Sequence, residues 1–543
     1  MKLESVFLKV FLIILVGGSS TALGVQRVEA SGTIYIRADG SIDPPTAPIS
    51  TVDNSTYAFA DNINDSIVVE RDNTVIDGAG HTLYIDRMWY VGIDLAGRTN
   101  VTVRNAQITN AAFLGLAGIG LNSSSNNSII GNNITNNRGY GIVLHSSSNN
   151  SIIGNNITAN HNFGICLDSS SSNRVSENNI TNNDYEGICL GWSSSNSICG
   201  NNIAHNGEGG IWLYCSFSNS IIGNNITANH SFGICLDSSS SNRISENNIT
   251  NNDYEGICLG WSSSNSICGN NIAHNGEGGI WLYCSFSNSI IGNNITANNE
   301  YGIRLEHSST NSVIGNNIAK SEYGISFYGD SSGNRFYHNH FIDNSQQVRV
   351  YPYANVWDDG YPSGGNYWSN YNGTDSDQDG IGDTPYAIDV NSTDNYPLMG
   401  MFYCSAMIWQ EKLYAVNIIS NSTVSRIGHV VQTLSQWPNH TIIEESFESI
   451  FFYVSGEDGT YGFCRVDIPV DLLNATYRVF VNRTEVPCNL LPCSNSTHSY
   501  LYFNYTHSKQ EVTVIPEFPS FLIPPLFFLA TLLAVITYRR KRR

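Results

Sequence analysis

A group of aspartates after the middle of the chain has the spacing of a cation-binding loop. The motif reads DxDxDGxxD, and its candidate ligand positions are Asp375, Asp377, Asp379, Ile381 and Asp383. Oxygen ligands at alternate positions around a glycine turn are what Ca²⁺ requires. The twelfth position is Tyr386, so the bidentate ligand of an EF-hand is missing, and Asp389 is an alternative ligand. The pattern predicts a calcium site, and a solvated acidic turn is the alternative interpretation.

Aromatic and acidic residues recur in register through the centre of the sequence. The aromatic set is Trp192, Trp212, Tyr214, Trp261, Trp281 and Tyr283, and the acidic set is Glu186, Glu208, Glu255 and Glu277. A flat aromatic face can stack on a sugar ring while carboxylates accept its hydroxyl protons. We therefore predict a glycan-binding surface made of these residues. The alternative is that the rings pack on one another or cover the flank of the fold.

The twelve cysteines fall into two groups. Near the C-terminus, Cys404, Cys464, Cys488 and Cys493 are an even number, which suggests two disulfides in an exported domain. Three pairings are open, of which Cys488 with Cys493 is the easiest local one. In the central region Cys166 and Cys189 occupy the same position of adjacent repeats, as do Cys235 and Cys258. Stacking would bring the Cα atoms of each pair to about 4.8 Å, inside the disulfide range, with free thiols as the alternative.

A repeat of 23 residues must position all of these central side chains. One unit, Asn122 to Leu144, reads NSSSNNSIIGNNITNNRGYGIVL, and eight units keep this period through Leu305. Ile or Val recurs at unit position 8, and Ile recurs at position 13. Positions 21 and 23 carry an Ile/Leu pair, which predicts a strand whose position 22 faces outward. Asn recurs at position 11, where stacked amides can bond from coil to coil, and Gly at position 20 suits a bend. Short strands that share an inner face predict a parallel β-helix with one unit per coil.

A longer repeat lies inside the short one. Residues 168–236 and 237–305 differ at five positions, among them Val175/Ile244 and Cys235/Arg304. Three coils were copied as a block, which indicates that the solenoid tolerates changes in length. The copying also argues against a unique catalytic centre within these coils.

The remaining segments set the organisation of the chain. The net charge is −20, which disfavours nucleic acid because nucleic-acid binding needs a basic face. Six segments are predicted: 1–30, a signal peptide; 31–121, irregular N-terminal coils and cap; 122–350, regular coils; 351–400, a closing block with the acidic loop; 401–515, an antiparallel β-sandwich; and 516–543, a membrane-spanning or sorting tail. Export agrees with Asn-x-Ser/Thr acceptors such as Asn54, Asn100, Asn133, Asn156 and Asn474, which predict a glycoprotein.

The tail predicts the location of the protein. An apolar run from Phe518 to Tyr538 is long enough to span a bilayer, and Arg539–Arg543 (RRKRR) would stay inside, which leaves the body outside. The Pro516–Pro519 motif before it (PEFP) resembles the PEF-CTERM sorting signal of archaeal surface proteins. The resemblance implies that an archaeosortase removes the tail and attaches the protein to the envelope. A plain single-pass anchor is the alternative.

The coils resemble a known family. The IxGNxIxxNxxGIxL units, the entry NTVIDGAGHTL and the closing block Gly364 to Leu398 are similar to NosD-type β-helix proteins and to carbohydrate-binding and sugar-hydrolysis domains with pectin-lyase-like folds. The resemblance covers about residues 31–400. It implies a right-handed parallel β-helix, and for NosD namesakes a role in copper delivery. Relatives include epimerases and lyases, but we identify neither a Cys/His/Met copper cluster nor a complete catalytic set.

The sequence therefore predicts an all-β, exported and envelope-anchored protein with a β-helix, a β-sandwich and a C-terminal transmembrane helix. Its expected role is to bind glycans or to act as a structural or adhesive element at the cell surface, without an organic cofactor. The alternatives are an enzyme acting on polysaccharide (lyase, hydrolase or epimerase) and NosD-like copper-cofactor handling.

Overall fold

The computed structural model describes residues 32–85, 90–111, 116–349, 353–433, 446–473 and 476–516. The predicted signal peptide, the sequon at Asn474 and the sorting tail beyond Pro516 lie outside these residues. None of the described segments forms a helix with the length and apolar character needed to cross a membrane. The chain divides into two compact units, the first made of Met1–Phe336, Phe341–Val356 and Ile388–Ser392, and the second of the remainder.

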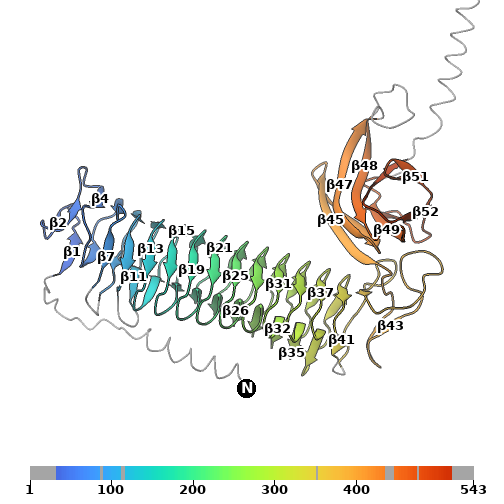
Figure 1. The fold of residues 1–543 in the computed structure, drawn as a ribbon, viewed down its shortest axis with the longest axis horizontal. Coiled ribbons are helices and arrows are strands. Elements are labelled where there is room, and N and C mark those ends of the chain that lie inside the picture. The colour runs from blue at the N-terminus through green and yellow to red at the C-terminus, as the bar shows by residue number, and fades with distance from the viewer. Residues whose placement is uncertain are drawn as a thin grey trace, which may run out of the picture. The chain divides into compact units, whose positions relative to one another are not determined.

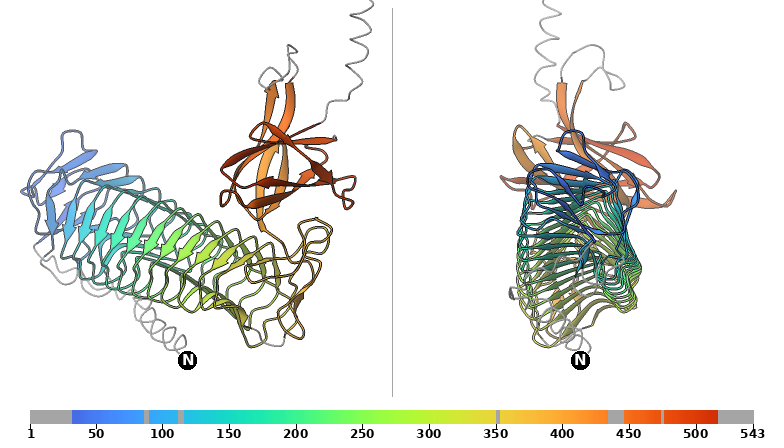
Figure 2. Two further views of the ribbon diagram at one scale, coloured as in Figure 1. Left: turned by 45° about the vertical axis from the view of Figure 1, so that its right-hand side comes forward. Right: turned by 90° about the vertical axis from the view of Figure 1, so that its left-hand side faces the viewer.

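The first unit is a parallel β-solenoid, as the repeat predicts. Each regular coil contributes one strand to each of three sheets, and the strands stack in chain order along the solenoid (Figures 1 and 2). In the described residues sheet A has 15 strands, of which only β2 pairs antiparallel: β2 (Ile42–Asp43), β1 (Thr33–Ile36), β5 (Ser66–Val69), β8 (Ile93–Asp94), β11 (Ala117–Asn122), β14 (Tyr140–His145), β17 (Ile165–Asp168), β20 (Ile188–Gly191), β23 (Ile211–Tyr214), β26 (Ile234–Asp237), β29 (Ile257–Gly260), β32 (Gly278–Tyr283), β35 (Tyr301–Glu306), β38 (Tyr323–Tyr328) and β41 (Gln346–Arg349).

Sheets B and C form the other two sides of each coil. Sheet B runs through β3 (Ile49–Ser50), β4 (Thr56–Phe59), β6 (Thr74–Asp77), β9 (Val101–Arg104), β12 (Ser128–Ile130), β15 (Ser151–Ile153), β18 (Arg174–Ser176), β21 (Ser197–Cys199), β24 (Ser220–Ile222), β27 (Arg243–Ser245), β30 (Ser266–Cys268), β33 (Ser289–Ile291), β36 (Ser312–Ile314) and β39 (Arg335–Tyr337). Sheet C runs through β7 (Thr82–Tyr84), β10 (Gln107–Thr109), β13 (Asn133–Thr135), β16 (Asn156–Thr158), β19 (Asn179–Thr181), β22 (Asn202–Ala204), β25 (Asn225–Thr227), β28 (Asn248–Thr250), β31 (Asn271–Ala273), β34 (Asn294–Thr296) and β37 (Asn317–Ala319).

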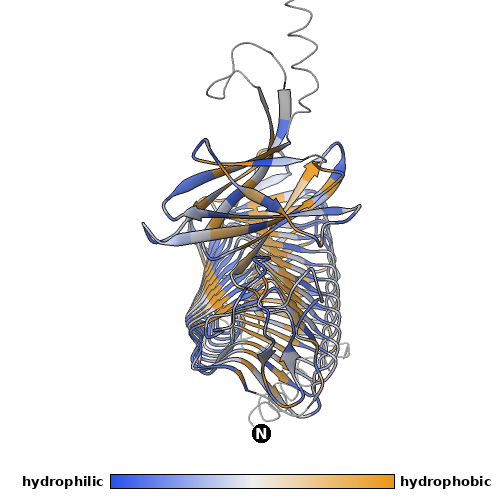
Figure 3. Ribbon diagram, turned by 90° about the vertical axis from the view of Figure 1, so that its right-hand side faces the viewer, coloured by the Kyte–Doolittle hydropathy of each residue, from blue (hydrophilic) through white to orange (hydrophobic). Residues whose placement is uncertain are grey.

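Stacked aliphatic side chains fill the interior of the solenoid. The register places each residue opposite its equivalent 23 positions later, for example Ile165 opposite Ile188 and Leu167 opposite Leu190. All four of these side chains are fully buried. The hydrophobic residues consequently form continuous rows along the coils, which Figure 3 shows as bands of orange. The predicted inward phases of the repeat are therefore confirmed.

Asparagine ladders satisfy the polar groups at the bends. The predicted ladder at position 11 is present: the side-chain amide of Asn178 donates to Asn201 Oδ1 at 2.9 Å, and the amide of Asn201 donates to Asn224 Oδ1 at 2.9 Å. Two further interior ladders run through Asn150 and Asn160 and their equivalents. An additional ladder lies on the outer face of sheet C, where the amide of Asn202 donates to Asn179 Oδ1 at 2.7 Å.

The glycine at position 20 is needed for a different reason than a bend. Gly187 does not have a positive φ, whereas Gly200, at position 10, has φ 66°. A Cβ built on Gly187 would lie 2.5 Å from Ile203 Cγ2 and 2.9 Å from the carbonyl oxygen of Gly210 in the next coil. Position 20 thus requires glycine because neighbouring coils approach closely there. Position 10 has a positive φ that glycine favours but that Glu177 and Glu246 also adopt, with φ 60° and 59°.

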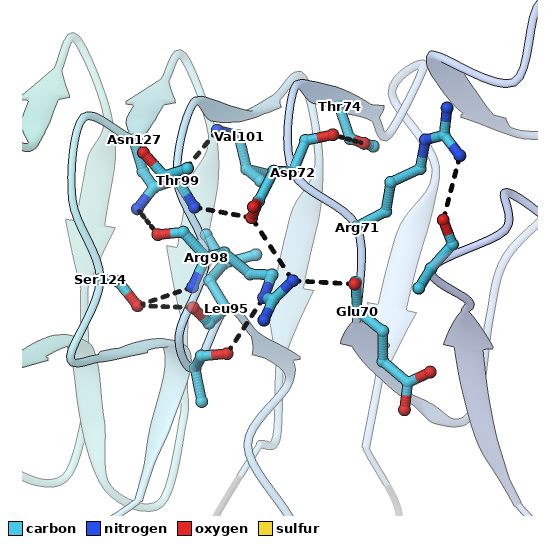
Figure 4. Close-up of polar contacts among 12 residues, drawn as sticks. Glu70, Arg71, Asp72, Thr74, Leu95, Arg98, Thr99, Val101, Ser124 and Asn127 are labelled. Carbon is cyan, nitrogen blue, oxygen red and sulfur yellow. Dashed lines mark hydrogen bonds and ion pairs between the residues drawn. The ribbon is translucent and has the colours of Figure 1, made fainter.

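In the irregular N-terminal coils, charged side chains form the hydrogen bonds between coils that asparagines form in the regular ones. Arg98 donates from Nη1 to the carbonyl of Glu70 at 2.8 Å and forms an ion pair with Asp72 at 3.4 Å (Figure 4). Asp72 also accepts the main-chain N–H of Thr99 at 3.0 Å. The regular ladder begins one coil later, where Asn127 accepts the N–H of Val101 at 2.9 Å.

The second unit holds the predicted antiparallel sandwich. One sheet has the order β45 (Met401–Trp409), β46 (Lys412–Ser420), β49 (Tyr461–Pro469), β53 (His498–Thr506), β52 (Cys488–Leu490), and the other β47 (Thr423–Thr433), β48 (Ser446–Ser455), β54 (Gln510–Pro516), β50 (Tyr477–Val481), β51 (Thr484–Val486). Their inner faces share a core that includes Val466 and Phe452. The unit also includes the short strands β42 (Tyr367–Trp368), β43 (Tyr386–Ala387) and β44 (Thr393–Asp394), and β40 (His340–Ile342) begins in it.

A second, smaller core joins the acidic closing block to the sandwich. Ile381 and Leu398 of the block pack with Phe463 and Tyr502 of the sandwich. The closing block from Trp357 to Ala387 thus belongs to the same compact unit as the sandwich.

Candidate functional site

Two equivalent aromatic clusters lie on sheet A, three coils apart. In cluster 1 the ring of Trp192 meets Tyr214 edge-on at a centroid distance of 5.1 Å, and Trp212 lies 5.9 Å from the same tyrosine. In cluster 2, Trp261 and Trp281 lie 5.0 and 6.1 Å from Tyr283. The coil spacing places the two clusters about 14 Å apart. The structure therefore brings all six predicted aromatic residues together in two groups of three.

The two tryptophans of each cluster differ in exposure. Trp192 directly follows β20 with a positive φ of 50°, and Trp261 follows β29 with φ 49°. This backbone turn leaves 47% of Trp192 and 46% of Trp261 exposed. Trp212 lies within β23 between its register partners Cys189 and Cys235 and is only 5% exposed. Cluster 1 thus presents one indole to solvent and buries the other, whereas Trp281 of cluster 2 is half-buried.

Position 22 of the repeat faces outward but is largely covered. Cys166, Cys189, Trp212, Cys235 and Cys258 form a buried row together with Phe163. Tyrosine and phenylalanine rings of the preceding bend pack against this row. The side chains at these positions thus point outward but are covered by residues of the bends.

Two of the four predicted glutamates are buried beneath aromatic rings. Phe232 lies over Gly209, where an added Cβ would meet the ring at 2.2 Å. Glu186 occupies the same repeat position as Gly209, one coil earlier. In the second block Tyr301 lies over Gly278 and donates from its hydroxyl to Glu255 Oε1 at 2.7 Å. Burial raises the pKa of Glu186 to about 8 and that of Glu255 to about 7.

The other two glutamates remain accessible. Glu208 is exposed and Glu277 is half-buried. These two are therefore the carboxylates that a ligand on sheet A could meet, while Glu186 and Glu255 are held within the fold.

Arg304 distinguishes cluster 2 from cluster 1. Its guanidinium carbon lies 5.3 Å from the ring of Trp281 and 4.2 Å from that of Tyr328. The equivalent residue of cluster 1 is Cys235, so Trp212 has no arginine beside it. The indole N–H of Trp281 is buried without a hydrogen-bond partner. Arg304 was not predicted as a site residue, although its replacement of Cys235 in the duplicated block is visible in the sequence.

The cysteine register of the central coils matches the repeat. Cys166 pairs with Cys189 and Cys235 with Cys258 on neighbouring strands, and the Sγ atoms of the second pair lie 2.7 Å apart. No disulfide is present in the described part of the chain. The adjacent thiol and burial raise the pKa of Cys189, and burial and the adjacent thiol raise that of Cys235.

The four C-terminal cysteines are spread over the sandwich. Cys464 is fully buried in β49, and burial raises the pKa of its thiol to about 12. Cys404 is exposed on β45, and β46 separates this strand from β49. Cys488 lies in β52, and Cys493 packs against the core shared with the closing block.

The acidic loop gathers three of its predicted ligands. Asp375, Asp377 and Asp379 each offer a carboxylate oxygen within 4.8 Å of the others. Burial and the charge of the neighbouring aspartate raise the pKa of both Asp375 and Asp379, although main-chain N–H groups donate to each. Asp383 instead accepts the main-chain N–H of Ser376 at 2.8 Å. Ile381 donates its own N–H to Asp379 and buries its side chain.

This donor set fits a hard cation better than copper. Carboxylate oxygens suit Ca²⁺, whereas copper favours imidazole and thiolate or thioether groups. Among the described residues the aspartate trio is the group of three or more His, Cys, Asp or Glu side chains that is placed to hold one metal ion.

Comparisons with known proteins agree with the solenoid. The family model described as periplasmic copper-binding protein (NosD) matches residues 177–276 and 233–373, and that described as right handed beta helix region matches residues 67–226. Comparison with curated protein sequences gave no match.

Solved structures with similarity to the chain share low sequence identity with it. The A-module of Azotobacter vinelandii mannuronan C-5 epimerase AlgE6 has 14% identity and a TM-score of 0.43, over 57% of this chain and 92% of that one. PfbA, a surface adhesin of Streptococcus pneumoniae, has 12% identity and a TM-score of 0.37, over 50% and 82%. Over residues 67–373 the chain is thus similar to right-handed β-helix and NosD family models.

Proposed function

We propose that this protein is an exported surface β-helix that binds polysaccharide along sheet A. One observation carries the proposal: two equivalent aromatic clusters present a half-exposed indole, Trp192 or Trp261, at a fixed separation along a rigid solenoid. An exposed indole face is suited to stacking on a sugar ring. The exposed Glu208 and the half-buried Glu277 can accept hydroxyl protons. A repeating polymer can engage both clusters at once and gain avidity.

The test is a screen of polysaccharides against the full-length protein in detergent, followed by replacement of the exposed indoles. Trp192→Ala with Trp261→Ala should lower affinity for the best polymer at least about tenfold, since stacking is worth about 1 kcal/mol or more per ring. The matched control is Phe217→Ala with Phe286→Ala, because these rings are each 44% exposed in the same duplicated blocks. Unchanged binding in the tryptophan variant, or an equal loss in the control, would rule out this surface.

Product analysis after incubation separates binding from turnover. A binding protein leaves the chain length and the sugar composition of the polymer unchanged. Cleaved, unsaturated or epimerised products would instead support a polysaccharide-acting enzyme.

The same proposal includes anchoring at the cell envelope. It is supported by the signal-like N-terminus, the sequons and the apolar run that ends in RRKRR. Removal of the tail by a sortase is the form of anchoring that the PEF-like motif favours. Protease added to intact cells should digest residues 31–515, and full protection of these residues would contradict an exterior location.

We also propose that the acidic loop binds Ca²⁺ and stabilises the second unit. The support is the convergence of Asp375, Asp377 and Asp379 in a loop whose neighbouring residue Ile381 is packed on the sandwich. Bound cation would offset the mutual repulsion of these carboxylates.

A further inference from the structure

A cavity in the second unit is lined by a buried arginine that forms no direct ion pair with the described residues. The cavity is lined by His338, Ser363, Phe402, Arg465, Asp467 and Tyr500, together with Asn417. All of these residues belong to the same compact unit, and none takes part in the clusters of sheet A. The cavity is therefore independent of the proposed glycan-binding surface.

Arg465 is 2% exposed, and most of its hydrogen-bonding capacity is unused. Nη2 donates to the carbonyl of Pro362 at 2.6 Å, and the guanidinium carbon lies 4.9 Å from the centre of the Tyr500 ring. Nε and Nη1 are buried and have no partner. Buried charges are normally paired or fully hydrogen-bonded, because leaving one uncompensated destabilises the fold.

His338, which also lines the cavity, is not protonated and adds no positive charge to it. Its ring stacks on Phe402 with the centroids 3.7 Å apart, and Nε2 lies 3.1 Å from the carbonyl oxygen of Ser363. Burial lowers the pKa of His338 to about 4, so the ring is neutral at pH 7. Among the residues that line the cavity, Arg465 therefore supplies the positive charge.

Asp467 supplies an unpaired acceptor on the same side of the same strand. It follows Arg465 by two residues in β49, so both side chains leave one face of the sheet. Its Oδ2 accepts the amide of Asn417 at 3.0 Å, while Oδ1 is buried without a partner. In the described part of the chain no carboxylate oxygen lies within 4.0 Å of the Arg465 guanidinium, so the two groups do not satisfy each other.

These unsatisfied groups define the chemistry of a ligand. The unpaired N–H donors of Arg465 favour an anionic ligand, and the geometry of a carboxylate matches that of a guanidinium. The free oxygen of Asp467 calls for a hydrogen-bond donor such as a hydroxyl group. An inorganic anion without a proton, such as sulfate, would satisfy the arginine but would face the Asp467 carboxylate without donating to it. The rings of Phe402 and Tyr500 offer apolar walls to the carbon atoms between the two polar groups.

We propose that this cavity binds a small hydroxy-carboxylate, with its carboxylate on Arg465 and its hydroxyl on Asp467. Such a group occurs in free hydroxy acids and at the ends of uronic-acid chains. Calorimetric titration of the full-length protein in detergent with glycolate and with a uronic-acid disaccharide distinguishes these two sources. Acetate serves as a probe that lacks the hydroxyl group, and sulfate as one that lacks both the hydroxyl group and the carboxylate.

Wild-type protein should bind glycolate or the disaccharide at least tenfold more tightly than acetate or sulfate. Arg465→Met should abolish this binding because it removes the donors, and the melting temperature of the ligand-free variant shows whether it folds. Arg465→Lys keeps the charge but loses the planar donor set, so it should weaken binding and provides a second test if Arg465→Met does not fold. Arg478→Met is the matched control, since Arg478 lies on the same sandwich in an exposed ion pair with Glu485.

Asp467→Asn tests the second half of the site. Removal of the negative charge should strengthen binding of acetate and sulfate and thereby reduce the preference for the hydroxy acid over these two anions. Binding of acetate or sulfate to the wild-type protein as tightly as glycolate would overturn the proposed ligand class. Undiminished glycolate binding in Arg465→Met and Arg465→Lys would overturn the site itself.

Discussion

At the scale of single residues, the duplicated blocks show how one hydroxyl group changes the environment of a carboxyl group. Glu186 and Glu255 are equivalent and both are buried. Tyr301 donates a hydrogen bond to Glu255, but the equivalent ring over Glu186 belongs to Phe232, which has no hydroxyl group. The pKa of Glu186 is accordingly raised further, to about 8 against about 7 for Glu255. The same fold therefore holds two carboxyl groups that differ in their affinity for a proton.

Glu186 should make the stability of the protein depend on pH. The folded state keeps its proton up to about pH 8, whereas the unfolded chain loses it near pH 4.5, so stability should fall as pH rises through this window. The glutamine of Glu186→Gln cannot ionise. The wild type should therefore lose on the order of 3 kcal/mol of unfolding free energy between pH 5 and pH 8 that the variant does not lose. Thermal unfolding at a series of pH values measures this difference.

Two variants test the cause of that effect. Glu177→Gln changes an exposed carboxyl group in the same coil as Glu186 and should leave the pH dependence as it is. Phe232→Tyr should supply the missing hydroxyl and lower the pH at which stability is lost. If Glu186→Gln and the wild type lose stability equally between pH 5 and pH 8, Glu186 is not protonated in the fold.

At the scale of structural elements, the inner and outer asparagine ladders have similar bonds but different surroundings. Asn201 is buried and links Asn178, Val175 and Asn224, whereas Asn202 lies on the outer face of sheet C beside Asn179. Water can replace the bonds of the outer amide but not those of the inner one. The inner ladders should therefore carry the stabilisation, and the outer one should contribute little.

Adjacent single substitutions separate the two ladders. Asn201→Ala leaves the buried N–H groups of Asn178 without an acceptor and should cost about 2–4 kcal/mol of unfolding free energy. Asn202→Ala should cost less than about 1 kcal/mol. Chemical denaturation of both variants measures the difference, and equal losses would show that burial does not distinguish the ladders.

The outer ladder also bears on glycosylation. Asn133, Asn156 and Asn179 are sequon residues, and each is joined to the next by side-chain amide hydrogen bonds. Adjacent coils place these amides about 4.8 Å apart, which leaves no room for a glycan on every coil. A glycan at any one of them would also break the ladder locally.

The acidic loop should respond to calcium through Asp377. Asp375 and Asp379 also hold main-chain N–H groups, so replacing them would disturb the loop itself, whereas Asp377 is exposed. Saturating Ca²⁺ should raise the melting temperature relative to chelator, since a ligand at 100 times its Kd stabilises by about 2.7 kcal/mol. Asp377→Asn should reduce that increase severalfold, and Asp458→Asn, an exposed control, should not. An identical melting temperature with Ca²⁺ and with chelator in the wild type would contradict the site.

At the scale of the whole molecule, the sequence predicts the strand register of the repeating backbone but not the side-chain contacts between different coils. Register follows from the period, so the inward Ile and Leu rows and the stacked Cys166 and Cys189 could be predicted. The burial of Glu186 could not be predicted, because it depends on the ring of Phe232, which belongs to a coil two further along and packs over Gly209. The Arg465 cavity could not be predicted either, since its residues extend from His338 to Tyr500 and no spacing relates them. Only the alternation within GFCRVDIP indicates that Arg465 and Asp467 share a face.

The block duplication allows the solenoid to be shortened without changing its phase. Deletion of residues 237–305 removes three coils and joins Leu236 to Glu306, which occupies the same repeat position as Asp237. Every remaining strand then keeps its sheet and its inward face. Because solenoid stability is approximately a sum of coil and interface terms, the shortened protein should fold with a modestly lower melting temperature.

The same deletion removes cluster 2 and leaves cluster 1 intact. Affinity for a long polysaccharide should then fall at least about tenfold, because simultaneous binding at two sites is lost. Affinity for an oligosaccharide too short to reach both clusters should fall at most about twofold, since one of two independent sites remains. Trp261→Ala, which keeps the full length, should reproduce the loss for the long polymer. If the deletion and Trp261→Ala both leave polymer affinity unchanged, the two clusters do not act together, and the duplication serves the length of the solenoid instead of its binding.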